Sequence, residues 1–143
     1  MPTAERLLDR KGHSLAWLGP TATVFEAAQL MNDKHIGSVL ILEGGELRGI
    51  FTERDVMRRV VSERLNPETT TVGEVMTRKV VCASPHTTLE ELRFVMREQR
   101  IRHIPVVDTG AVLGMISIGD LNDAERQVQV ETIEYLSSYM SVT

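Results

Sequence analysis

The stretch Gly49-Ile50-Phe51-Thr52-Glu53-Arg54-Asp55 decides the fold, because it returns 65 residues later as Gly114-Met115-Ile116-Ser117-Ile118-Gly119-Asp120. Each copy has a glycine, two apolar residues, a hydroxyl residue, and an aspartate three places after the hydroxyl. The same offset pairs Pro20 with Pro85, well upstream of both copies. The chain therefore contains an internal duplication, and each half is expected to form the same structural unit.

The end of each copy is typical of a strand that runs into a helix. The hydroxyls of Thr52 and Ser117 can accept hydrogen bonds from free N–H groups at the helix start, and the aspartates can reach back to the cap. A helix start is also positive in potential and rich in donors, which suits a phosphate. In this second interpretation Asp55 and Asp120 accept hydrogen bonds from a ribose diol, as acidic residues do in dinucleotide-binding folds. The two roles are compatible.

Composition limits the class of protein. Of the 143 residues, 42% are apolar and 25% are charged, which is typical of one globular domain or two small units. The net charge of −4, without a large basic face, argues against nucleic-acid binding. No apolar run reaches membrane-spanning length, no signal peptide is evident, and the single cysteine cannot form an internal disulfide. We expect a soluble cytoplasmic protein without a membrane partner.

Each half is predicted to run strand, helix, strand, strand, helix. The first helices begin at Thr23 and Thr88, each with a glutamate three residues later at the capping-box position. Adjacent glycines at 44 and 45 predict a two-residue hairpin turn. The other strands are predicted from short apolar runs at 15–18, 80–83, 39–42 and 104–107. The fold class is therefore α/β.

A polar, proline-containing break at 66–71 is the predicted linker between the two units. The first unit, with an N-terminal segment, takes 1–65, and the second unit takes 72–122. The remaining 123–143 is predicted to be a C-terminal helix, because apolar residues recur at helical spacing as far as Tyr139. Such a stripe packs either on its own chain or on another subunit.

Together these features resemble a tandem pair of cystathionine β-synthase (CBS) domains. The resemblance rests on the duplicated Gly-x-x-Thr/Ser-x-x-Asp phrase, Ile104-Pro105-Val106-Val107, Val75-Met76 before the second unit, and Arg102-His103 at its central strand. It covers nearly the whole chain, from about Arg6 to Leu121. It implies two β-α-β-β-α units related by a pseudo-twofold axis, in a stand-alone regulatory protein that is not an enzyme.

The resemblance also implies an adenosine compound in the cleft between the units, as a regulatory ligand rather than a required cofactor. AMP is expected first, with ATP, ADP, NAD(H) or S-adenosylmethionine as alternatives. In the site completed by the second unit, Asp120 would hold the ribose hydroxyls and Ser117 would contact ribose or phosphate. Arg102 and His103 would face the phosphates. The adenine would lie near Trp17, Leu18 and the backbone of Ser38 and Val39.

The mirror site would use Thr52 and Asp55, with its adenine near Val81, Cys82 and Ile104. Its positions equivalent to Arg102 and His103 are Gly37 and Ser38, which carry no charge. We therefore expect the mirror site to bind phosphate more weakly than the Ser117/Asp120 site.

Other chemistry is less well supported by the residues. Cys82 is expected to be a strand residue rather than a nucleophile, because no flanking sequence favours a thiolate. The four histidines lack metal-ligand spacing, so no metal site is expected. A sensor acts through different ligand affinities of two conformations, so the expected partners are a second copy in a homodimer and an unidentified effector protein. The alternative function is a structural dimerisation module without a ligand.

Overall fold

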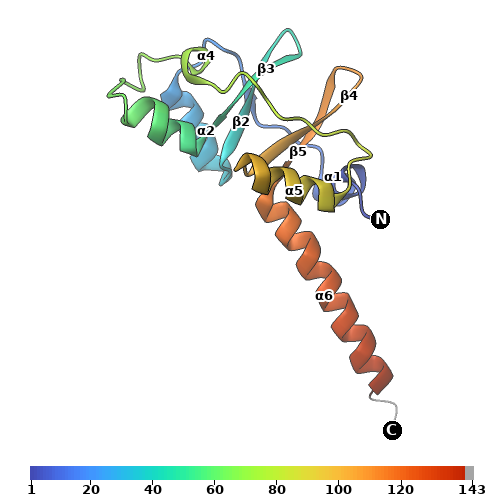
Figure 1. The fold of residues 1–143 in the computed structure, drawn as a ribbon. Helices are drawn as coiled ribbons and strands as arrows, with labels where there is room; N and C mark the ends of the chain where they lie inside the picture. Colours follow the sequence, from blue (N-terminus) through green and yellow to red (C-terminus); the bar gives the residue numbers. More distant parts are fainter. Residues whose placement is uncertain (141–143) are drawn as a thin grey trace.

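The computed structural model describes residues 1–140, and Figure 1 shows two small α/β units side by side with one long helix projecting from the second. The first unit contains β1 (Trp17–Leu18), α2 (Val24–Lys34), β2 (Ser38–Glu43), β3 (Glu46–Thr52), α3 (Glu53–Asp55) and the π-helical segment η1 (Val56–Val61). The second unit contains α5 (Leu89–Gln99), β4 (His103–Asp108), β5 (Ala111–Ser117) and α6 (Ile118–Met140). Helices α1 (Ala4–Lys11) and α4 (Val72–Val75) precede the two units.

Each unit is built on a small sheet. Strand β1 pairs parallel with β2, which pairs antiparallel with β3, whereas β4 and β5 form an antiparallel pair. The hairpin between β2 and β3 turns at Gly44 and Gly45, with φ of 60° and 81°. Thr109 and Gly110 have φ of 49° and 82° in the second hairpin. Positive φ at both turn residues is what a two-residue hairpin of this kind requires, so the predicted turn is confirmed.

The strand predicted at 80–83 does not form, and only Ala83 makes a bridge, to Val106. In the first unit the Leu40 N–H donates to the Ala16 carbonyl at 3.0 Å. The residue 65 positions after Leu40 is Pro105, which has no N–H, so the equivalent hydrogen bond cannot be made. The duplicated sequence therefore forms a three-stranded sheet in one unit and a two-stranded sheet in the other.

Threonines begin α2 and α5 as predicted. The Thr23 hydroxyl accepts the Glu26 N–H at 3.1 Å, and the Thr88 hydroxyl accepts the Glu91 N–H at 3.1 Å. Both helices are followed by a left-handed residue with φ of 55°, His35 in the first unit and Arg100 in the second. The repeat thus fixes both ends of these helices, and with them the start of the central strands.

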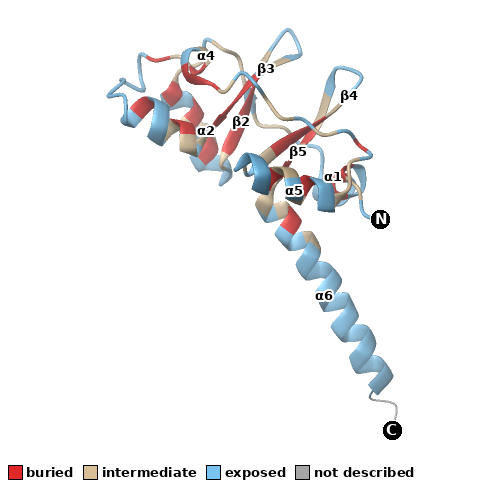
Figure 2. Ribbon diagram, viewed as in Figure 1, coloured by how far each residue is buried: buried red, intermediate tan, exposed pale blue. Residues whose placement is uncertain are grey.

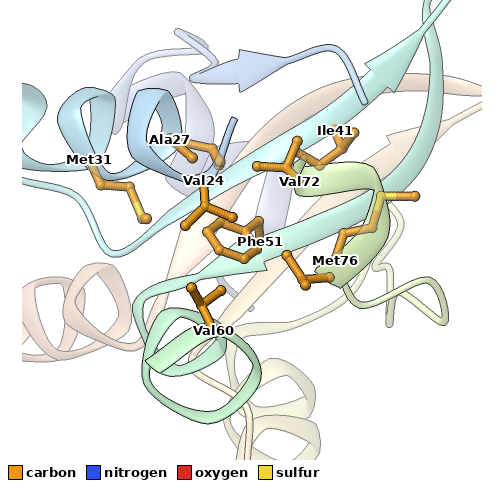
Figure 3. Packing of buried hydrophobic residues seen from close by; sticks show 10 residues of the cluster. Val24, Ala27, Met31, Ile41, Phe51, Val60, Val72 and Met76 are labelled. Atoms are coloured by element: carbon orange, nitrogen blue, oxygen red, sulfur yellow. The ribbon is translucent and has the colours of Figure 1, made fainter. Parts of the chain in front are cut away.

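Two hydrophobic cores hold the units, and each is completed by the helix that precedes the other repeat. Figure 3 shows the first core, in which Val72 and Met76 from the α4 segment pack with α2, β2 and β3. In the second core Leu7 and Leu8 of α1 pack with α5, β4 and β5. Helix α1 therefore lies on the second unit, although the sequence-based division groups it with the first. Each of these two helices therefore precedes one unit in the sequence and packs on the other.

Helix α6 runs without a break from Ile118 to Met140, so the predicted C-terminal helix is a continuation of the helix that follows β5. Residues 141–143 of that prediction lie outside the described residues. Figure 2 shows that the helix is exposed for most of its length beyond its buried first turns. Exposed apolar side chains on it are Val128, Val130, Ile133, Tyr135, Leu136, Tyr139 and Met140. Within residues 1–140 no helix is both long and apolar enough to cross a bilayer.

Candidate functional site

The larger of two related cavities between the units, here called the Asp120 cleft, has a volume of about 340 Å³. The second unit contributes Ser117 and Asp120, at the end of β5 and the start of α6. The first unit contributes the opposite wall, from residues 14–16 before β1 and residues 34–38 between α2 and β2. Both units are therefore needed to form the cleft.

The smaller cavity, here called the Asp55 cleft, has a volume of about 170 Å³ and is built in the same way with the units exchanged. The first unit contributes Thr52 and Asp55, and the second contributes residues 79–81 and 101–103. At an offset of 65 these segments match those that line the Asp120 cleft. The relation between the repeats therefore extends to their clefts.

Asp120 forms a capping box with Ser117 at the start of α6. Its Oδ2 atom accepts the Ser117 N–H at 2.8 Å, and its own N–H donates to Ser117 Oγ at 3.1 Å. The Lys11 ammonium donates to the same Oδ2 and to the Met115 carbonyl. Among the residues that the structure describes, none donates to Oδ1 of Asp120. The predicted cap is present and leaves one carboxylate oxygen for another donor.

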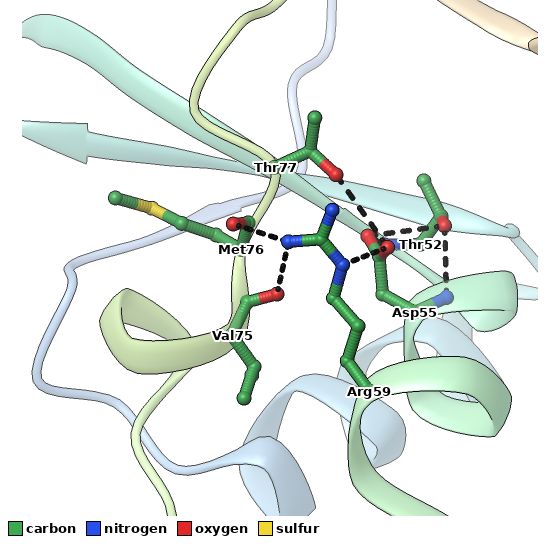
Figure 4. A network of polar contacts seen from close by, with 6 residues as sticks. All are labelled: Thr52, Asp55, Arg59, Val75, Met76 and Thr77. Atoms are coloured by element: carbon green, nitrogen blue, oxygen red, sulfur yellow. Dashed lines mark hydrogen bonds and ion pairs between the residues drawn. The ribbon is translucent and has the colours of Figure 1, made fainter. Parts of the chain in front are cut away.

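Asp55 forms the equivalent capping box with Thr52 but has more partners (Figure 4). Its Oδ2 accepts the Thr52 N–H at 3.0 Å and the Thr52 hydroxyl at 3.2 Å. Its Oδ1 lies 3.5 Å from both the Thr77 hydroxyl and Arg59 Nε. Both carboxylate oxygens are therefore engaged, and the Asp55 side chain is only 11% exposed.

Arg59 ties this network to the α4 segment. Its guanidinium donates to the carbonyls of Val75 and Met76, at 3.3 and 3.1 Å, while it contacts Asp55 (Figure 4). Two different chain segments thus converge on one carboxylate. In the Asp55 cleft the aspartate holds the structure together as well as lining the cavity.

The structure divides Arg102 and His103 differently from the expected arrangement. Arg102 lines the Asp55 cleft and not the Asp120 cleft, whereas His103 lines both. His103 is directly opposite Ser117 in the β4–β5 ladder, so the two side chains share a face. Arg102 is one residue earlier, before β4 begins. In this structure Arg102 is therefore not among the residues around Ser117 and Asp120.

His103 contributes little positive charge at neutral pH. Burial lowers the pKa of its imidazole, and nearby Lys11 and Arg102 lower it further, against the opposing effects of Glu53 and Asp120. A neutral imidazole still offers one N–H donor and one acceptor. His103 thus lines both clefts as a polar, mostly neutral side chain rather than as a permanent cation.

The remaining candidate residues line neither cleft. Val39 and Ile104 are buried in the first and second cores, and Leu18 packs against the first. The Trp17 side chain is 53% exposed, and Cys82 is also exposed. Of the residues expected around the adenine, the structure places Ser38 in the Asp120 cleft and Val81 in the Asp55 cleft.

Two lysines that are absent from the sequence-based set also line the Asp120 cleft. Lys34 lies at the end of α2, and Lys11 at the end of α1. A lysine before Gly12 is visible in the sequence as a helix-end signal. Its neighbour Asp120 is not, because the contact requires α1 to pack on the second unit. Within residues 1–140 no group of three or more metal-ligating side chains is placed to hold an ion.

The duplicated α/β units and their two related clefts define a tandem-repeat module with its candidate sites between the repeats. The chain belongs to the CBS domain family, whose profile matches residues 12–62 and 72–126. The family and fold class expected from the sequence are thus confirmed. A CBS domain pair is a regulatory module, and proteins made only of CBS domains are generally not catalytic.

Similar proteins have the same organisation. The chain is 33% identical to the CBS domain-containing protein CBSX3, mitochondrial, of Arabidopsis thaliana, over 96% of this chain and 71% of that protein. The crystal structure of the CBS domain protein NE2398 is 39% identical, with a TM-score of 0.83, and covers 86% of this chain and 96% of its own. The CBS domain pair of MJ0100, solved in complex with 5′-methylthioadenosine and S-adenosyl-L-methionine, has a TM-score of 0.78. At 22% identity, over 89% of this chain and 98% of its own, that likeness concerns the fold.

Proposed function

We propose that this CBS pair is a regulatory sensor that binds an adenosine nucleotide in the Asp120 cleft. The observation that carries the proposal is the combination of a two-unit cavity with an aspartate whose Oδ1 is without a donor among the described residues. Ribose hydroxyls can donate to such an oxygen without breaking the cap at Ser117. The adenosine ligands of the MJ0100 pair support this ligand class.

The size of the cavities favours the same cleft. Small-molecule pockets have volumes of about 300–1,000 Å³. The Asp120 cleft, at about 340 Å³, falls inside this range, and the Asp55 cleft, at about 170 Å³, falls below it. The contacts of Asp55 also favour the Asp120 cleft, because a ribose at Asp55 would compete with Arg59 and Thr77 for its carboxylate oxygens. We therefore assign the ligand to the Asp120 cleft and a structural role to Asp55.

The ligand can then be placed by the chemistry of the walls. The ribose lies at Asp120 and Ser117, and the base lies against the backbone of residues 36–38 and the apolar pair Leu15 and Ala16. AMP, ADP, ATP, NAD(H) and S-adenosylmethionine share this adenosine part. A change in the angle between the units, or the binding of an effector protein, would pass the signal on.

Calorimetric titration of these five compounds into the purified protein, its Asp120→Ala variant and its Asp55→Ala variant tests the proposal. Asp120→Ala should weaken adenosine-ligand binding by roughly 1–3 kcal/mol, the cost of losing hydrogen bonds to a charged acceptor. It should lower the free energy of unfolding by about 1 kcal/mol, the value of a cap. Asp55→Ala is the matched control and should lower the free energy of unfolding more and the affinity less. Unchanged ligand affinity in Asp120→Ala would show that Asp120 caps the helix but does not contact the ligand.

A structural dimerisation module is the second candidate, and the exposed apolar face of α6 is the observation that favours it. In that case none of the compounds would bind even at millimolar concentration. An enzyme would instead turn a nucleotide over, and its nucleophile would need activation. Although Cys82 is exposed, partial desolvation by its neighbours raises the pKa of its thiol, which disfavours the reactive thiolate.

A further inference from the structure

Lys11 enters the Asp120 cleft from a helix that precedes the first repeat. Helix α1 is fixed on the second unit by Ala4, Leu7 and Leu8, which are buried in the second core. Lys11 is its last residue, and its ammonium donates to the Asp120 carboxylate and the Met115 carbonyl. A cation is thus held at the carboxylate to which the ribose is assigned.

In the other cleft an uncharged residue, Thr77, makes the equivalent pair of contacts. There Thr77 donates its N–H to the Ile50 carbonyl at 2.9 Å, and its hydroxyl lies 3.5 Å from Asp55 Oδ1. Ile50 and Met115 are equivalent in the repeat. The cation nearest Asp55 is Arg59, which donates to the Val75 and Met76 carbonyls and does not line the cavity. The two clefts therefore differ in the groups that contact their aspartates, and only the Asp120 cleft is lined by the cation that pairs with its aspartate.

The contacts of Lys11 leave it able to bind another group. An ammonium has three N–H donors, and two are used by Asp120 and Met115. The Lys11 side chain is 34% exposed and lines the cavity, so its third donor is accessible. The long, flexible side chain can also follow an anion over a short distance.

We propose that Lys11 is the residue by which the Asp120 cleft selects a ribose that carries a phosphate. Its ammonium binds the phosphate oxygens, while Oδ1 of Asp120 accepts a ribose hydroxyl. Lys34, which lines the same cleft, adds a second positive charge. This inference rests on the proposed function, because it concerns the ligand of the same cleft. Lys11 would then make the phosphate contact that was expected of Arg102, which lines the other cleft.

A purely structural role would give a different result. A partly exposed lysine–aspartate pair contributes little to stability, about 0–1 kcal/mol. The three buried side chains of α1 keep the helix in place without it. Replacing Lys11 should therefore change ligand selection without unfolding the protein.

Calorimetry with adenosine, 5′-AMP and 2′-AMP tests the inference on the wild-type protein, Lys11→Met and Lys11→Arg. The wild type should prefer at least one of the phosphorylated compounds to adenosine. Lys11→Met should bind that compound about tenfold more weakly, because a hydrogen bond to a charged group is lost. Adenosine should bind as well as before or better, because Oδ2 of Asp120 is released. Lys11→Arg should restore the preference.

Lys79→Met is the control, because Lys79 lines the Asp55 cleft and should leave these affinities unchanged. The salt dependence of phosphorylated-ligand binding should decrease in Lys11→Met, which a structural role would not produce. Equal losses for adenosine and AMP in a folded Lys11→Met protein would overturn the role of Lys11 and leave the adenosine site standing. Failure of the wild type to bind any of the three compounds would overturn the proposed function, and this inference with it.

Discussion

Among single residues, Asp55 and Asp120 occupy equivalent positions but differ in their surroundings. Each accepts the N–H of the hydroxyl residue three places earlier, at 3.0 Å in one unit and 2.8 Å in the other. Asp55 is further held by Arg59, whereas Asp120 meets the ammonium of Lys11. The local phrase thus builds the cap, and residues distant in sequence decide whether the carboxylate is also free to bind a ligand.

His13 offers a pH-dependent link next to Lys11. Its Nδ1 lies 3.0 Å from the Leu113 carbonyl and its Nε2 lies 3.0 Å from Asp9 Oδ1. Both neighbours are acceptors, so both ring nitrogens must carry a proton. The hydrogen bond to Asp9 and then the one to Leu113 raise the pKa of His13 above its ordinary value of 6.5.

The sign of the pH effect follows from the raised pKa. The contribution of His13 to stability should be complete below the pKa of the unfolded chain and lost as pH rises through the higher folded pKa. NMR titration should give His13 a pKa above 6.5 in the folded protein. The stability difference between wild type and His13→Ala should shrink over the same pH interval. A His13 pKa at or below the ordinary value would show that one of the two hydrogen bonds is absent.

At this scale the sequence predicts what depends on neighbours in the chain. The hydroxyl–aspartate caps are local, and so the pattern was sufficient to predict them. The contact between Lys11 and Asp120 spans 109 residues and depends on where α1 packs. Which cleft Arg102 lines depends on how the two units pack together. Neither is encoded in a local motif.

Among the elements, the glycines of the repeated phrase show how closely β3 and β5 approach their neighbours. A Cβ on Gly49 would lie 2.5 Å from Met76 Sδ and 2.8 Å from the Thr77 carbonyl oxygen. A Cβ on Gly114 would lie 2.6 Å from a Leu8 methyl group. The α4 segment therefore packs directly on β3, and α1 packs directly on β5.

The two glycines make a matched pair of substitutions. Gly49→Ala meets a backbone carbonyl, which also accepts the Ile50 N–H at 3.0 Å and cannot move alone. Gly114→Ala meets the end of a side chain, which can change its rotamer. We expect Gly49→Ala to lower the free energy of unfolding by about 1–3 kcal/mol, as overpacking does, and Gly114→Ala to cost less. Urea denaturation of both variants provides the measurement, and a larger cost at Gly114 would contradict this packing.

The sequence predicts the order of the helices and strands better than it predicts which of the strands form. Caps at Thr23 and Thr88 and the glycine turn at 44–45 are short-range signals, and the structure contains all of them. The strand expected at 80–83 is lost because its neighbour is Pro105, a partner more than twenty residues away. An apolar run predicts a strand from that strand's own side chains. Whether the strand forms also depends on the backbone donors and acceptors of its partner.

For the whole molecule, the exposed face of α6 indicates association. Val128, Tyr135, Leu136 and Tyr139 lie beyond the buried part of the helix, and each is more than half exposed. A contiguous apolar face of this kind is unusual on a monomer. We propose that it packs against the same face of a second copy, since self-complementary twofold dimers are the commonest assembly.

Light scattering coupled to gel filtration checks this proposal. The wild type should have the mass of a dimer, and a Tyr135→Ser/Tyr139→Ser double variant should shift towards monomer while its circular-dichroism spectrum remains that of a folded protein. A double variant on the polar side of the helix, Gln127→Ser/Glu134→Ser, should remain dimeric. A monomeric wild type at micromolar concentration would rule out the dimer.

The exchange of α1 and α4 between the cores has a consequence for the order of events during synthesis. The first core is complete as soon as Met76 has been made, since all its buried members precede that point. The partners of α1 are made much later, and the last of them is Leu121. Helix α1 is thus made before its partners but is among the last helices to pack. Until then its buried face, Leu7 and Leu8 included, remains uncovered, and cutting the chain at the linker would leave it so permanently.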